Sequence, residues 1–129
     1  MTDNEFYSIA QKLIGRSYEI DSYNCRHLAC DFMIELGIDA YQVFGVGHGE
    51  NNKQWRDSYR ALVKSFERVE VAESCLLLAY GDGNHVAIKH KNKVLHNYGT
   101  GKNGQVVLTD WLSFKDSFHR IDFYLFPVK

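Results

Sequence analysis

The chain has 129 residues, 45% of them hydrophobic and 14% aromatic, which suits one domain built around one core. Its net charge of −1 and pI of about 6.6 exclude the strong positive field that is typical of nucleic-acid-binding proteins. No stretch reaches the roughly 20 apolar residues of a membrane span, and the polar, acidic start lacks the pattern of a signal peptide. We therefore expect a single domain over residues 1–129 that is made in the cytoplasm, with neither a membrane span nor a nucleic-acid partner.

The first predicted element is a helix over about residues 4–14. Its apolar residues recur at steps of three and four, which is the spacing of one buried helical face. Thr2 and Glu5 have the spacing of a capping box, and Gly15 is a suitable C-terminal stop. The residues predicted to face the core are Phe6, Ile9, Ala10, Leu13 and Ile14.

A second helix is predicted to begin near Cys25, with Asn24 or Ser22 as its cap, and to end at Gly37. Counting back along its apolar stripe by three and four residues leads to Cys25, so the thiol lies at the N-terminal rim of the buried face. The unpaired backbone N–H groups and the positive end of the helix dipole favour a nucleophilic thiolate there. Such a nucleophile needs a base from elsewhere in the fold. The stripe consists of Leu28, Ala29, Phe32, Met33 and Leu36.

Residues 39–66 are predicted to form a glycine-rich loop followed by a third helix. Gly45, Gly47 and Gly49 alternate, but no Gly-Lys-Ser/Thr follows them, so a loop beside a cleft is favoured over a phosphate-binding loop. From residue 53 to residue 66 the apolar period is again helical.

After residue 67 the apolar period changes from helical to extended. Alternating or continuous apolar runs bounded by turn residues predict strands, and residues 111–114 form a short connecting element. Helices first and an antiparallel sheet second is the α+β pattern. The predicted strands cover residues 68–71, 75–80, 85–90, 93–98, 105–108 and 120–126.

Two histidines are predicted to meet on the hairpin formed by residues 85–98. If the turn is centred on Lys91 and Asn92, His85 and His96 become diagonal neighbours on one face, roughly 7–8 Å apart at the backbone. Two such imidazoles can serve as a base and its orienting partner, by the logic of a catalytic triad. A three-residue loop would instead place His96 on the other face.

Five stretches together resemble the NlpC family of papain-like cell-wall peptidases, in particular the small single-domain members found among tail genes of tailed phages. These stretches are Ile-Gly-Arg-Ser-Tyr at 14–18, Tyr-Asn-Cys at 23–25, Glu-Leu-Gly-Ile at 35–38, Asn-His-Val-Ala-Ile at 84–88 and Val-Leu-His at 94–96. The resemblance spans essentially the whole chain. It implies a papain-like α+β fold, with the N-terminal helices packed on an antiparallel sheet.

The resemblance also implies the roles of individual residues. Cys25 would be the nucleophile, His85 the base and His96 the residue that orients it. The reaction would be amide hydrolysis through an acyl-enzyme, without a cofactor or metal. The residues expected to line the substrate site are Tyr18, Tyr23 and His27, with a solvent-facing helix position as the alternative for His27.

The expected substrate is a peptidoglycan stem peptide, because the family cleaves such peptides, commonly next to D-glutamate or diaminopimelate. The expected partners are other phage tail-tip proteins, and the expected place of action is the virion tail or the periplasm after delivery. In this chain large residues, Arg26 and His27, follow the cysteine where the family usually has Ser-Gly.

Three alternatives remain open at this point. A catalytically silent structural or docking module of a phage tail would keep the fold without the chemistry. An injected antibacterial effector would keep both. A zinc site could use Cys25, His27, Cys30 and a strand histidine, although the paired Cys-x-x-Cys of structural zinc sites is missing.

The remaining cysteines and histidines are assigned to ordinary positions. The chain has three cysteines, an odd number at spacings that do not indicate a disulfide framework. Cys30 and Cys75 are predicted to be core residues. His90 and His119 are predicted to lie at the surface.

Overall fold

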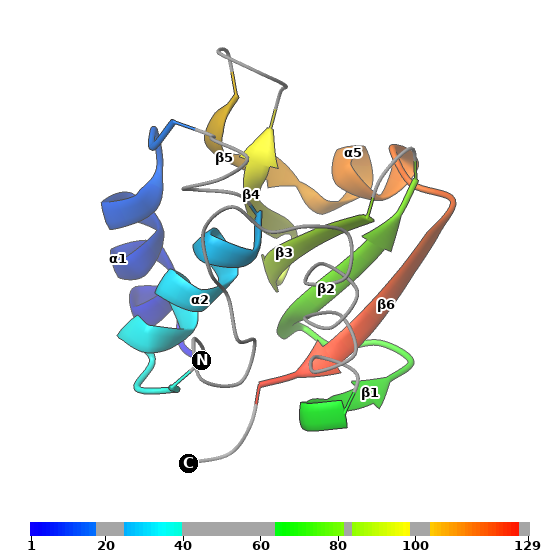
Figure 1. The fold of residues 1–129 in the computed structure, drawn as a ribbon, viewed down its shortest axis with the longest axis horizontal. Coiled ribbons are helices and arrows are strands. Elements are labelled where there is room, and N and C mark those ends of the chain that lie inside the picture. Colours follow the sequence, from blue (N-terminus) through cyan, green and yellow to red (C-terminus); the bar gives the residue numbers. More distant parts are fainter. Residues whose placement is uncertain (18–24, 40–63, 82–83, 99–103, 127–129) are drawn as a thin grey trace, which may run out of the picture.

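The structure is a computed structural model that describes residues 1–17, 25–39, 64–81, 84–98 and 104–126. Within them it has the predicted α+β composition (Figure 1). No helix in these ranges combines the length and the apolar character that crossing a bilayer requires. The elements are α1 (Asp3–Leu13), α2 (Cys25–Glu35), β1 (Glu67–Val69), β2 (Ser74–Tyr80), β3 (Asn84–His90), β4 (Lys93–Tyr98), β5 (Gln105–Asp110), α5 (Trp111–Asp116) and β6 (Arg120–Leu125).

The six described strands form one antiparallel sheet in the order β1-β6-β2-β3-β4-β5. Helices α1 and α2 lie together on one face of this sheet, and the short helix α5 lies against the other face (Figure 1). The papain-like expectation included helices packed on an antiparallel sheet, and this coarser part is confirmed.

Helix α1 begins with the predicted capping box. The Thr2 hydroxyl accepts a bond from the Glu5 backbone N–H, and the Glu5 carboxylate accepts one from the Thr2 backbone N–H. Gly15 follows the helix with a φ of +92°, a conformation that glycine adopts without a steric penalty. Ile14 is 45% exposed rather than part of the core, because the backbone leaves the helix at this residue.

Helix α2 runs from Cys25 to Glu35, and Gly37, the predicted stop, follows it with a φ of +85°. The Gly37 N–H bonds to the Ile34 carbonyl and the Ile38 N–H bonds to the Met33 carbonyl, which is the Schellman pattern. The predicted caps at residues 22 and 24, the loop at 40–52 and most of the third helix lie outside the described residues.

The β3–β4 hairpin has the predicted register. His90 is opposite Lys93 and Lys89 is opposite Val94, so the turn consists of two residues. Lys91 takes a positive φ of 53°, as two-residue hairpin turns require. The alternative with a three-residue loop is therefore wrong.

Side chains alternate along the strands between two apolar layers. One layer, here called the helical layer, packs the sheet against α1 and α2. The other, called the α5 layer, packs it against α5. The sheet residues of the helical layer are Leu76, Leu78, Val86, Ile88, Leu95, Val106 and Tyr124, and those of the α5 layer are Cys75, Leu77, Ala79, Ala87, Val94 and Phe123.

Candidate functional site

Cys25 occupies the predicted position at the start of α2. It is 3% exposed and belongs to the helical layer, together with Leu28 and Ala29 of its own helix. The thiol therefore lies between α2 and the face of the sheet that α2 covers.

His85 and His96 share one face of the sheet, as the hairpin register predicted. The His96 ring meets the Phe114 ring edge-on, at a centroid distance of 4.8 Å, and the His85 ring meets Phe118 in the same way at 5.7 Å. His96 Nε2 is 2.9 Å from the Thr109 hydroxyl. Both imidazoles therefore belong to the α5 layer.

The structure does not bring Cys25 together with the two histidines. Val86 and Ile88 point into the helical layer, so strand alternation directs His85 and Ala87 to the opposite face. The sheet lies between the thiol and the imidazoles. The expectation that all three meet in one groove is corrected accordingly: the pairing of the histidines is as predicted, but the helix that carries the thiol covers the other face.

Burial changes the protonation of the paired histidines. Burial lowers the pKa of His85. Burial, together with repulsion from a protonated His85, lowers the pKa of His96 to about 4. Both rings are therefore neutral at pH 7. The Nδ1 atom of His85 is buried and has no hydrogen-bond partner among the described residues.

The residues expected to line the substrate site are only partly described. Tyr18 and Tyr23 lie outside the described residues. His27 is 4% exposed on α2, so the solvent-facing alternative for it is wrong. Cys30 and Cys75 are fully buried core residues, as predicted, and burial raises the pKa of Cys75 to about 12.

His90 is not at the surface, and this corrects its predicted placement. It is 2% exposed, and its ring stacks on Phe6 of α1 at a centroid distance of 4.9 Å. Its Nδ1 lies 2.6 Å from the Ser74 hydroxyl, and its Nε2 lies 2.7 Å from the Asp3 carboxylate. We call these three residues the Ser74–His90–Asp3 chain.

The contact between Ser74 and His90 could have been predicted from the sequence. Ser74 and His90 are directly opposite in the β2–β3 hairpin, so a correct register for that hairpin would have paired them. Asp3 is 87 residues from His90 in the sequence. No local sequence pattern indicates the contact between Asp3 and His90.

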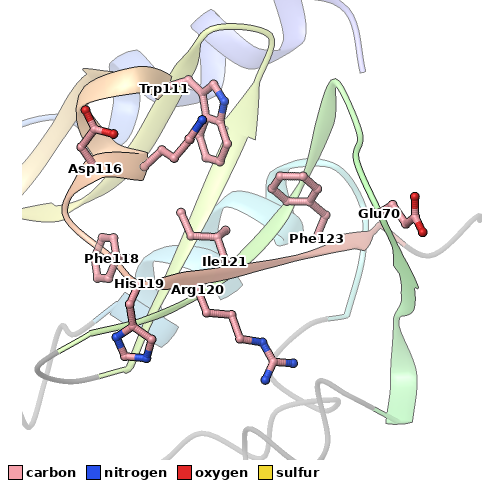
Figure 2. A pocket seen from close by; sticks show the side chains of 9 residues that line it. Glu70, Trp111, Asp116, Phe118, His119, Arg120, Ile121 and Phe123 are labelled. Atoms are coloured by element: carbon pink, nitrogen blue, oxygen red, sulfur yellow. The ribbon is translucent and has the colours of Figure 1, made fainter.

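The α5 layer is open at one side, where a groove of about 550 Å³ runs between α5 and β6 (Figure 2). Trp111, Ile121 and Phe123 point toward its centre. The Lys89 ammonium lies over the Trp111 ring, 5.4 Å from its centroid, and helps to hold the ring in place. The residues that line this groove, here called the α5 groove, are Glu70, Trp111, Lys115, Asp116, Phe118, His119, Arg120, Ile121 and Phe123.

The rim of the α5 groove carries both signs of charge. Lys115, Asp116 and Glu70 are exposed there. Arg120 lines the groove, but its guanidinium is held by Asp122 at 2.9 and 3.1 Å and lies over the Tyr80 ring. Lys115 is the ammonium at the rim, beside two carboxylates and the paired Arg120 guanidinium.

Within the described ranges, no three side chains of histidine, cysteine, aspartate or glutamate gather closely enough to hold a metal ion. No protein-family model matches the sequence, and a search of curated proteins returns no relative.

Proposed function

We propose that this chain is a binding module that holds a short peptide with both a free amine and free carboxylates in the α5 groove. The observation that carries the proposal is the composition of the groove, an apolar and aromatic floor with one ammonium and two carboxylates at its rim. Ligand sites in proteins commonly have this combination and a volume of this size.

Peptidoglycan stem peptides, the substrate class that the sequence resemblance suggests, match this composition. Their small apolar side chains suit the floor formed by Ile121 and Phe123. The free end of a diaminopimelate carries an amine and a carboxylate, which complement Glu70 and Lys115. The rigid Trp111 ring offers contact area at little entropic cost, because Lys89 and the Phe123 ring already hold it.

The setting that we propose is a phage tail tip, with other tail proteins as partners, or an injected antibacterial effector. Both settings would use peptide binding at the cell wall. Genomic neighbours distinguish them, since tail-tip genes would flank the first and an immunity gene would flank the second.

Isothermal titration calorimetry with purified muropeptides tests the binding site. We expect Trp111→Ala and Lys115→Glu each to weaken binding about tenfold or more, a loss of at least about 1.4 kcal/mol. Leu112→Ala is the matched control, because Leu112 is the 67% exposed neighbour of Trp111 on α5 and does not line the groove. Equal affinities for Trp111→Ala and the parent would refute the proposal.

A cysteine peptidase is the second candidate. Two observations favour it: Cys25 begins an 11-residue helix, and His85 and His96 are close enough to affect each other's protonation. Catalysis by these three residues would require them to meet on one side of the sheet. Mass spectrometry of sacculi after incubation with the protein decides between the candidates: stem-peptide cleavage by the parent and none by Cys25→Ser would replace the binding module by a peptidase.

A further inference from the structure

We infer that the Ser74–His90–Asp3 chain is a chemically competent site separate from the α5 groove, with Ser74 as a nucleophile that accepts acyl groups from small carboxylic esters. It lies on the helical-layer face of the sheet, opposite the α5 groove, and uses none of the residues of that groove. It therefore goes beyond the binding function proposed above.

The hydrogen bonds of the chain have the order that nucleophile activation needs. Ser74 begins β2, His90 ends β3 and Asp3 begins α1, so three elements meet at one imidazole. The Ser74 Oγ to His90 Nδ1 distance is 2.6 Å, and the His90 Nε2 to Asp3 Oδ1 distance is 2.7 Å. One tautomer satisfies both contacts: Nε2–H donates to Asp3, and Nδ1 accepts from the Ser74 hydroxyl.

The imidazole is held in this orientation by packing as well as by its two bonds. The His90 ring is nearly parallel to the Phe6 ring, with an interplanar angle of 27°. It is 2% exposed, whereas Ser74 is only partly buried. The base is therefore fixed in a dry environment, within hydrogen-bond reach of a nucleophile that lies nearer to solvent.

Asp3 has the charge that a positioning carboxylate needs. The bond from Lys91, at 2.8 Å, and that from His90 lower the pKa of Asp3. Its place in the first turn of α1 favours the same ionised form, because the helix N-terminus is positive. Asp3 is thus a carboxylate across the neutral pH range and keeps the proton of His90 on Nε2.

The acyl transfer that follows from this geometry has two steps. Ser74 Oγ attacks the ester carbonyl carbon and passes its proton to His90 Nδ1, and the departing alcohol takes that proton as the C–O bond breaks. Water then attacks the acyl-serine with His90 again as base, which releases the carboxylic acid and restores the Ser74 hydroxyl.

A fluorophosphonate probe tests the nucleophile, because it forms a stable phosphonyl ester with an activated serine and releases fluoride. We expect the parent protein to be labelled on the peptide that contains Ser74, and Ser74→Ala to lose this label. Ser113→Ala is the control: Ser113 is an exposed serine on α5, at the other face of the sheet, and its removal should leave labelling unchanged. We expect His90→Asn to slow labelling about 100-fold or more.

Asp3 acts through His90, so its test is a pH profile. With p-nitrophenyl acetate as substrate, Asp3→Asn should move the pH at which acylation reaches half its maximum, whereas a purely structural change would lower the rate equally at every pH. Peptide mapping on the parent does not depend on how any variant folds. Absence of the label from the parent, or equal labelling of Ser74→Ala, would overturn the inference.

Discussion

At the scale of single residues, His85 and His96 couple the stability of the fold to pH. Their rings are packed among the aromatic side chains of the α5 layer, which favours the neutral form of each. The pKa of both is lowered by burial, and that of His96 falls from the ordinary 6.5 to about 4. The unfolded chain therefore binds more protons than the folded chain between these values, and acid favours unfolding.

We predict that the free energy of unfolding falls as the pH drops from about 6.5 to 4, by on the order of 3 kcal/mol for His96 alone. Above pH 6.5 this contribution is fully present, because both states are then neutral at this residue. Urea denaturation at several pH values measures it. His96→Gln should flatten the curve relative to the parent, whereas His119→Gln, at an exposed position, should not. A parent and His96→Gln pair with equal pH dependence would contradict the assignment.

The pairing of His85 with His96 could be predicted from the sequence, whereas the burial of His90 could not. The spacing of His85 and His96 about a two-residue turn was enough to pair them, because the hairpin register depends on a few adjacent residues. The predicted surface position of His90 is wrong, because the residue is 2% exposed. Its burial depends on Phe6 and Asp3 of α1, which lie far away in the sequence.

At the scale of elements, α1 is an example of a helix whose limits are encoded locally. Its capping box joins the side chain and backbone of Thr2 to those of Glu5, and its first turn carries Asp3. The same turn supplies the carboxylate and the aromatic ring that hold His90. The cap therefore supports the Ser74–His90–Asp3 chain as well as the helix.

We predict that Thr2→Ala lowers the free energy of unfolding by about 1 kcal/mol, because the Glu5 backbone N–H loses its acceptor. Thr2→Ser keeps the hydroxyl and should retain most of the stability. Chemical denaturation of the three proteins under one set of conditions measures the difference. If Ser and Ala behave alike at this position, the hydroxyl bond does not stabilise the helix.

Helix α5 illustrates the opposite case. Its six residues are too few for an isolated helix to be stable, so it depends on the α5 layer. Phe114 is buried there against the rings of His96 and Trp111. The apolar residues of this segment predicted a connecting element, but only its contacts with the sheet make it helical and give the α5 groove its wall.

At the scale of the whole molecule, two apolar layers on one sheet bury all three cysteines. Cys25 and Cys30 lie in the helical layer, and Cys75 lies in the α5 layer. All three are at most 3% exposed. Thiol reagents should therefore reach them only when the layers open.

We predict that the native thiols react with Ellman's reagent roughly 100-fold more slowly, or slower still, than the same thiols in denaturant. Cys75 should be among the slowest, because burial raises its pKa to about 12. The denatured protein, in which three thiols should react, is the control. Rapid native reaction of Cys25, identified by peptide mapping, would contradict this burial and favour the peptidase candidate.

The sequence by itself determined the local features of this protein: the start and stop of the first two helices, the strands, the two-residue turn and the shared face of His85 and His96. Each depends on residues a few positions apart, where helical or strand periodicity and turn stereochemistry act directly. Only the tertiary structure decided which face of the sheet each helix covers. Both faces are apolar, since Val86 and Ile88 line one and Ala87 and Val94 line the other, so periodicity shows which side chains share a face without showing what packs on it. The separation of Cys25 from the two imidazoles and the meeting of Ser74, His90 and Asp3 both follow from that long-range packing.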